Sequence, residues 1–245
     1  MERPAMLELT AASPPALKRL YNMSEQRLRV ALPELFGRLL IQVGGTQVAN
    51  AVREAALMPC VVIDTPRSPG ADVWSELNAL PIPNACADAV VLPFTLGHCG
   101  APREVVRETH RLLNDRGRLV IVGLNPWSPW NWRLRWGWSA ERVPVMRSTP
   151  SLQRLRDWLE LLDFEVSEVV RFSHGRRGLS PLRDGEGAWL RRLMQPLQSA
   201  YILTARKRVI PMNRLPQLPW LRVRGAVGRP VEGGAAVARL PERPQ

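Results

Sequence analysis

The sequence has very little lysine and no long apolar run. Lysine occurs only at Lys18 and Lys207, although Lys and Arg together number 34. No stretch approaches the roughly 18 apolar residues that a membrane-spanning helix needs, because Asp88 and Pro93 interrupt the apolar segment 85–96. The chain also begins without the basic and apolar regions of a secretory signal. These absences predict a cytoplasmic protein with no transmembrane segment.

Cysteine is scarce as well. The three cysteines, Cys60, Cys86 and Cys99, are odd in number, widely spaced and set among apolar residues. This pattern fits neither a disulfide framework nor a zinc site. His110 and His174 have no neighbour at the spacing of metal ligands. We therefore expect buried reduced thiols and no metal site.

Positive charge is in excess, with a formal net charge of +12 and a pI of about 11.2. Residues 208–245 carry seven arginines against Glu232 and Glu242, a net of +5, in a segment rich in Pro and Gly. A solvated, disordered basic tail is the simplest interpretation of such a segment. The alternative is a weak contact of this tail with nucleic acid or an anionic surface.

Short apolar runs alternate with helical patterns in the middle of the chain. The apolar runs are 36–43, 60–63, 87–92 and 119–122, and helical periodicity covers 46–57 and 102–113. Strands that are apolar throughout and alternate with helices predict a parallel sheet buried on both faces. Right-handed crossovers then produce a doubly wound α/β fold.

Further elements are expected on both sides of this region. Two helical pieces precede it, and a helix capped by Ser151 and two strands follow it. Their ranges are 14–21 and 24–32 upstream, then 151–162, 164–170 and 200–205 downstream. The predicted organisation is a helical segment 1–35, an α/β domain 36–207 with a Trp-rich segment 123–150, and the tail 208–245.

Residues that follow the strands are the candidate binding positions, because open parallel sheets bind ligands at the carboxyl ends of their strands. Gly44 and Gly45 follow the first strand, where glycine lets the backbone approach a ligand closely. Asp64 ends the second strand and is placed to accept hydrogen bonds from a ribose diol. A glycine turn with an acid about twenty residues later indicates a nucleoside cofactor. An ordinary turn and an Asx turn are the alternative.

Three segments carry a recognisable pattern: residues 80–91 read LPIPNACADAVV, residues 107–113 read RETHRLL, and residues 114–121 read NDRGRLVI. In this order they resemble the LPF-P-(D/N)-x-(S/A)-F-D-x-V segment, the R-E-x-x-R-V-L segment and the k-p-G-G-x-L-v-i run of the methyltransferase type 11 family, which belongs to the class I S-adenosylmethionine-dependent methyltransferases. Segments 123–128 and 205–211 further resemble a subgroup of small bacterial methyltransferase-like proteins.

This resemblance implies a fold and a cofactor. The fold would be a Rossmann-like three-layer α/β sandwich with a mostly parallel seven-stranded sheet. The cofactor would be S-adenosyl-L-methionine, which donates its methyl group to an acceptor that the sequence does not identify. The resemblance spans roughly 39–122.

The resemblance also implies a set of cofactor-binding residues. Asp64 aligns with the acid that binds the ribose, and Glu76 with the acid that accepts from the adenine amino group. The full set is Gln42, Gly44, Gly45, Thr46, Asp64, Glu76, Leu77 beside the adenine ring, and Pro93 and Phe94 along the methyl-donor pocket. The first motif departs from the family, since Gln42 replaces an acid and Thr46 and Val48 replace glycines.

These replacements bear on whether the chain is active. If Thr46 and Val48 need a left-handed backbone, each costs about 1–2 kcal/mol, and together they weaken the cofactor roughly 10–1000-fold. A charged hydrogen bond from Asp64 offsets about 1.5–3 kcal/mol of this. The first hypothesis is a methyltransferase, and the alternative is a non-catalytic member that binds or acts as a scaffold. A nicotinamide oxidoreductase fits less well, because only Gly44 and Gly45 remain of a G-x-G-x-x-G motif.

Four residues are candidates for the acceptor side. His98 follows the fourth strand and is placed to take a proton from a hydroxyl acceptor, or it simply starts the next helix. Asn125 follows the fifth strand, as a substrate ligand or as a turn residue before proline. Trp127 and Trp130 belong to the segment 127–138, which we expect to form a lid over the substrate cleft. Base stacking, membrane-interface contact and core packing are the alternatives for this segment.

Overall fold

The computed structural model describes residues 15–66, 68–129, 149–172 and 198–208. They all belong to the first of two compact units of the chain, Met1–Val209. The helices are α1 Pro15–Ala31, η1 Leu32–Glu34, η2 Thr46–Val48, α2 Ala49–Ala55, α3 Thr95–His98, α4 Pro102–Leu112 and α6 Leu152–Leu161. The strands are β1 Leu40–Val43, β2 Cys60–Asp64, β3 Val73–Trp74, β4 Ala87–Pro93, β5 Leu113–Leu124, β6 Phe164–Phe172 and β7 Ala200–Lys207.

The strands form one seven-stranded sheet in the order β3-β2-β1-β4-β5-β7-β6. Neighbouring strands from β3 to β5 pair in parallel. β7 pairs antiparallel with both β5 and β6. The predicted Rossmann-like sandwich with a mostly parallel sheet is thereby confirmed.

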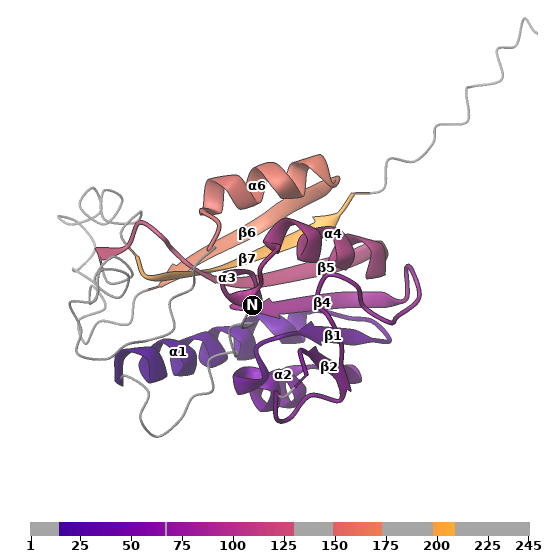
Figure 1. Cartoon of the computed structure of the whole chain (residues 1–245), viewed down its shortest axis with the longest axis horizontal. Helices are drawn as coiled ribbons and strands as arrows, with labels where there is room; N and C mark the ends of the chain where they lie inside the picture. Colours follow the sequence, from indigo (N-terminus) through magenta and orange to yellow (C-terminus); the bar gives the residue numbers. More distant parts are fainter. Residues whose placement is uncertain (1–14, 67, 130–148, 173–197, 209–245) are drawn as a thin grey trace, which may run out of the picture. The chain divides into compact units, whose positions relative to one another are not determined.

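Helices cover both faces of the sheet (Figure 1). On one face, α1 and α2 pack through residues such as Leu28 and Val52 onto Val91 and Val120. On the other face, α4 and α6 pack through residues such as Val106 and Leu155. The central strands are buried on both faces, which explains why their sequences are apolar throughout rather than alternating.

The strand order reverses direction between β1 and β4. From β1 the chain continues outward to β2 and β3, and from β4 it continues the other way to β5. Such a switch point separates the loops that follow the two strands, and ligands of open α/β sheets bind there. The candidate site is therefore expected where β1 and β4 end.

Several elements differ from those predicted by the sequence. The two helical pieces expected before residue 32 form the single helix α1, because the Ser24 hydroxyl donates to the Leu20 carbonyl (2.7 Å) within the helix instead of capping a new one. The residues 114–117, whose Asn, Asp and Gly are typical of a turn, lie inside β5 as an irregular stretch that does not pair with β4. Asn114 there donates to Asp88 at the start of β4, which joins this part of the strand to its neighbour. The cap predicted at Ser151 is confirmed, since its hydroxyl accepts from the Arg154 amide (3.3 Å).

A side-chain network joins two of the family-like segments. Arg111 of α4 donates to the carbonyls of Leu80 (3.0 Å) and Ile82 (2.8 Å) and to the Asn84 side chain. It also pairs with Glu108 (2.6 Å), whose carboxylate accepts from the Leu80 amide (2.8 Å). These hydrogen bonds lower the pKa of Glu108. The network fixes the loop before β4 onto α4.

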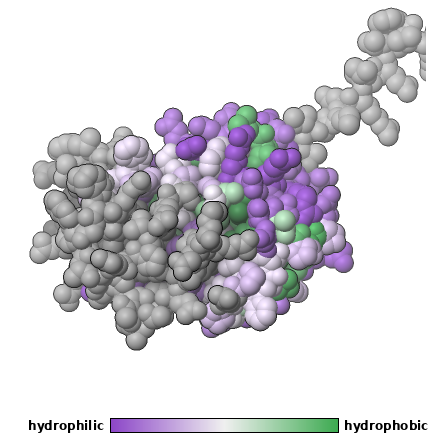
Figure 2. All heavy atoms as spheres, in the orientation of Figure 1, coloured by the Kyte–Doolittle hydropathy of each residue, from purple (hydrophilic) through white to green (hydrophobic). Residues whose placement is uncertain are grey.

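Figure 2 shows hydrophilic side chains over much of the described surface around α4 and α6, with only small apolar areas between them. Arg103 and Arg107 lie on this exposed side of α4. None of the helices in the described ranges is long and apolar enough to cross a bilayer.

Replacing Arg111 by Ala is expected to lower the free energy of unfolding by about 2–3 kcal/mol, because three oxygen acceptors and Glu108 lose their donor. Urea denaturation monitored by circular dichroism measures this loss. Arg107→Ala, one turn earlier on the exposed side of the same helix, is the control and should change stability by less than about 0.5 kcal/mol. Equal stability of the two variants would contradict a structural role for Arg111.

Candidate functional site

The loop after β1 presses against the end of β4. Gly44 and Gly45 have φ values of +73° and +61°, the left-handed conformation that glycine tolerates best. A Cβ atom built on Gly45 would lie 2.8 Å from Cβ of Pro93, and closer still to the Pro93 carbonyl. Glycine is therefore required at position 45 for two reasons: the backbone has a positive φ, and a side chain would clash with Pro93.

Gln42 holds this loop from within. Its fully buried amide nitrogen donates to the carbonyls of Gly44 (3.0 Å) and Gly45 (2.8 Å). A carboxylate at this position could not donate to either carbonyl. The replacement of the family's acid by Gln42 is thus matched to the loop conformation. The Gln42 Oε1 atom is buried and has no hydrogen-bond partner among the described residues.

Thr46 and Val48 do not adopt the left-handed backbone conformation that would make them weaken cofactor binding. Neither belongs to the described residues with positive φ, and Val48 has a φ of −105°. Val48 is instead fully buried and packs in the core beneath α1 and α2. Thr46 and Val48, which replace the family's glycines, therefore carry no left-handed strain. Their effect is limited to the space that their side chains occupy.

Asp64 ends β2 beside this loop and is completely buried. Its Oδ1 atom accepts from the Thr65 amide (2.6 Å), whereas Oδ2 has no hydrogen-bond partner in the described part of the chain. Burial raises the pKa of the carboxyl group, and nearby donors such as the Thr65 amide oppose this effect only in part. Asp64 is thus a buried acceptor with capacity for one more donor.

The other residues implied for cofactor binding differ in their exposure. Glu76 is exposed in the loop after β3, and Leu77 beside it is 6% exposed and packs in the core. Phe94 has a φ of +58°, and its buried ring packs at a tilt against the Tyr21 ring, with centroids 4.8 Å apart. At Phe94 only the backbone is left for a ligand, whereas Pro93 faces the β1 loop.

Thr95 joins the end of β1 to the end of β4. The sequence analysis did not single out this residue. Its buried hydroxyl donates to the Val43 carbonyl at the end of β1 (2.5 Å) and lies 3.4 Å from the Pro93 carbonyl. A threonine directly after a predicted strand carries no distinctive signal. Its role depends on the neighbour that the parallel pairing of β1 and β4 supplies.

His98 lies at the end of α3, just beyond these residues. Its Nδ1 atom is 3.0 Å from the Phe94 carbonyl, which can only accept, so Nδ1 carries the proton in the neutral ring. Burial lowers the pKa of His98, which favours that neutral form. Its Nε2 atom is buried without a hydrogen-bond partner among the described residues. A neutral ring with a bare, unpaired nitrogen has the properties of a general base.

Asn125 and Trp127 form the turn after β5. The Asn125 amide donates to the Gln198 carbonyl (2.9 Å), and its oxygen accepts from the Trp127 backbone (3.1 Å). The Trp127 ring is 77% exposed. Trp130 and most of the predicted lid lie outside the described residues. In this arrangement the Asn125 side chain shapes a turn, which was the predicted alternative to substrate binding.

The residues around the β1 and β2 ends fit a nucleoside cofactor. Two fully buried oxygen acceptors, Gln42 Oε1 and Asp64 Oδ2, have no partner among the described residues. Ribose hydroxyl groups are donors that such atoms lack. The positive φ values of Gly44 and Gly45 keep the adjoining loop free of side chains. The described residues contain no group of three side chains able to hold a metal ion.

The contact between Gly45 and Pro93 leads to a prediction about stability. Gly45→Ala should lower the free energy of unfolding by about 3 kcal/mol or more, because left-handed strain adds to a clash with Pro93. Gly70→Ala is the matched control. Gly70 has a φ of +85° with open space around its missing Cβ, so only the strain of about 1–2 kcal/mol applies. Thermal unfolding of both variants separates the two effects, and equal losses would rule out the clash.

Comparisons with known proteins agree with this geometry. A family model described as a methyltransferase domain matches residues 59–121, from β2 into β5, and begins after the β1 loop. The Escherichia coli (strain K12) protein YafS, described as uncharacterized, is 30% identical over 221 residues, which cover 86% of this chain and 87% of YafS.

Solved structures share the fold at lower identity. A SAM-dependent methyltransferase from Archaeoglobus fulgidus is 17% identical with a TM-score of 0.56, over 76% of this chain and 94% of that chain. The [4+2]-cyclase SpnF is 20% identical with a TM-score of 0.52, over 75% of this chain and 82% of its own. The chain therefore belongs to the family of YafS and to the type 11 class I S-adenosylmethionine-dependent methyltransferases, whose cofactor is S-adenosyl-L-methionine.

Proposed function

We propose that the protein is an active methyltransferase that passes a methyl group from S-adenosylmethionine to a hydroxyl-bearing acceptor at His98. The observation that carries this proposal is the bare Nε2 atom of His98, buried without a partner among the described residues. It lies in α3, which begins two residues after β4 ends at the switch point of the sheet. A proton acceptor in that position suits an acceptor that must lose a proton as it is methylated.

The residues at the ends of β1 and β2 would hold the cofactor. Asp64 would accept from the ribose through Oδ2, and Gln42 Oε1 would accept from a second donor of the ligand. The cofactor supplies a methyl group on a positively charged sulfur, which leaves as a neutral thioether. Pro93 and Thr95 keep the β4 end against the β1 loop, so that bound groups are held in a fixed orientation. Orientation supplies much of the rate of a displacement of this kind.

Cofactor binding can be measured on the whole chain by calorimetric titration with S-adenosylhomocysteine. Asp64→Ala should weaken binding on the order of tenfold, because a charged hydrogen bond to the ribose is lost. Asp115→Ala is the control, since this exposed acid of β5 lies far along the chain from the loops that would hold the ligand. Wild-type protein that gives no heat at millimolar ligand would contradict cofactor binding.

The role of His98 can be tested with radiolabelled S-adenosylmethionine and a cell extract as the source of acceptors. His98→Gln should slow label transfer about 100-fold or more, while S-adenosylhomocysteine affinity stays unchanged. Because burial lowers the His98 pKa, wild-type activity should persist as pH falls through 6.5, the ordinary value. Activity that is lost at or above that pH, or a variant as active as wild type, would argue against His98 as the base.

A non-catalytic binding or scaffold protein is the second candidate. Its support is Val48, whose side chain fills core space where the family has a glycine, together with the eroded motif around Thr46. If the protein is an active methyltransferase, the segment 127–138 with Trp130 would form a lid over the substrate, and Asn125 and Trp127 would contact the substrate.

Contact of the basic segment 208–245 with nucleic acid or an anionic surface is supported by its charge. A cytoplasmic location is supported by three free cysteines.

A further inference from the structure

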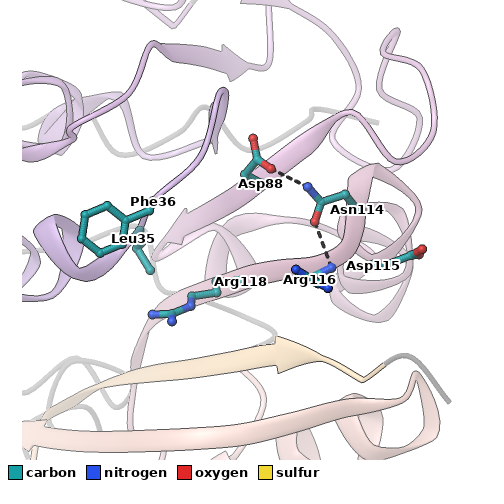
Figure 3. A pocket seen from close by; sticks show the side chains of 7 residues that line it. All are labelled: Leu35, Phe36, Asp88, Asn114, Asp115, Arg116 and Arg118. Atoms are coloured by element: carbon teal, nitrogen blue, oxygen red, sulfur yellow. Dashed lines mark hydrogen bonds between the residues drawn. The ribbon is translucent and has the colours of Figure 1, made fainter. Parts of the chain in front are cut away.

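A pocket of about 440 Å³ lies at the amino-terminal ends of the central strands, whereas the cofactor site lies at their carboxyl ends. It is formed near the start of β4 and β5 and by the residues that precede β1. Its lining residues are Leu35, Phe36, Asp88, Asn114, Asp115, Arg116 and Arg118 (Figure 3). This volume lies within the range of sites that bind small organic molecules.

Two arginines of β5, Arg116 and Arg118, line this pocket. Arg116 lies in the irregular stretch between Leu113 and Arg118, and Arg118 is the first residue of β5 to resume pairing with β4. Arg118 donates to the Glu34 carbonyl (3.2 Å), which orients its guanidinium group without neutralising it. Within the described residues neither arginine forms an ion pair, and the Arg116 side chain makes no hydrogen bond.

A third arginine lies next to them. Arg206 of β7 is directly opposite Arg118 in the antiparallel ladder. Side chains in such pairs are neighbours on one face, and like charges placed there destabilise a sheet. Glu165 of β6 is opposite Arg206 on its other side and offsets part of this charge.

The two carboxylates of the pocket form no ion pair with Arg116 or Arg118 among the described residues. Asp88 is already occupied by hydrogen bonds from the amides of Arg38 (2.6 Å) and Leu39 (3.1 Å) and from the Asn114 side chain. The Asp115 carboxylate points away from Arg118 and Phe36 (Figure 3). The guanidinium groups of Arg116 and Arg118 are therefore free to donate to an anion.

Phe36 gives the pocket an apolar wall. Its ring is 77% exposed, an unusual position for so large an apolar side chain, and it lies beside Leu35 at the side toward which Arg118 extends (Figure 3). A flat ring on a ligand could stack on it while its charged group contacts the guanidinium groups.

We propose that this pocket binds a small organic anion that carries a phosphate group and a flat apolar ring. Phosphate suits the site because it presents several oxygen acceptors to more than one guanidinium group. The binding is independent of the cofactor, since none of the residues implied for the cofactor lines the pocket.

Titration calorimetry of the full-length protein with phenyl phosphate tests this proposal. Phenyl phosphate should bind about tenfold more tightly than inorganic phosphate, and phenol alone should give no heat. Arg116→Gln and Arg118→Gln should each weaken phenyl phosphate about tenfold, the loss of one charged hydrogen bond. Arg116→Gln removes no contact within the described protein, so its effect cannot come from unfolding. Phe36→Ala should weaken phenyl phosphate but leave inorganic phosphate unchanged.

Two controls separate the pocket from other sources of binding. Arg103→Gln removes an exposed arginine of α4 outside the pocket and should leave phenyl phosphate affinity unchanged, whereas a loss equal to that of Arg116→Gln would reduce the effect to net charge and overturn the proposal. Asp64→Ala should also leave it unchanged, and a loss there would relocate the ligand to the cofactor site. Absence of heat at millimolar phenyl phosphate, or equal loss of both ligands in Phe36→Ala, would likewise overturn it.

Discussion

The ends of β1 and β4 lie in direct contact, and the arrangement of the site depends on this contact. The Gly45 backbone packs on Pro93 at a distance that leaves no room for a side chain. The Thr95 hydroxyl links the same two strand ends by binding the Val43 carbonyl. Both interactions require β1 and β4 to be adjacent and parallel, which the reversal of strand order ensures. Asp64 ends β2, the parallel neighbour of β1, and His98 ends α3, which begins at Thr95.

The sequence was sufficient for the fold because its central strands are apolar throughout and separated by helical periodicity. Runs such as 87–92 and 119–122 have this character, and both are buried strands in the sheet. Elements that depend on tertiary contacts were missed. The two-residue strand β3 is too short to show a pattern, and its pairing with Asp64 fixes it. The start of β5 contains Asn114 and Gly117, which favour a turn. They lie in an irregular stretch of the strand, and only Leu113 before it and Arg118 after it pair with β4.

For the site, residue type and position after a strand were informative, whereas hydrogen-bond partners were not. Asp64 and His98 were recognised as polar residues at strand ends, and both have an unpaired buried atom in the described structure. The significance of Gln42 was not visible, because its amide bonds to carbonyls whose orientation depends on the positive φ of Gly44 and Gly45. Whether a replaced glycine is strained likewise depends on backbone angles, and Val48 is unstrained at −105°.

The internal hydrogen bonds of Gln42 also affect the entropy of ligand binding. In a flexible glycine loop, part of the binding free energy is lost in ordering the backbone. Here the carbonyls of Gly44 and Gly45 are held by a side chain of the preceding strand, so the loop is ordered by the protein itself. Such preorganisation favours fast, rigid docking of a ligand of one shape over adaptation to several. Gln42 thus lacks the negative charge of the family's acid, but its neutral amide holds the loop in one conformation.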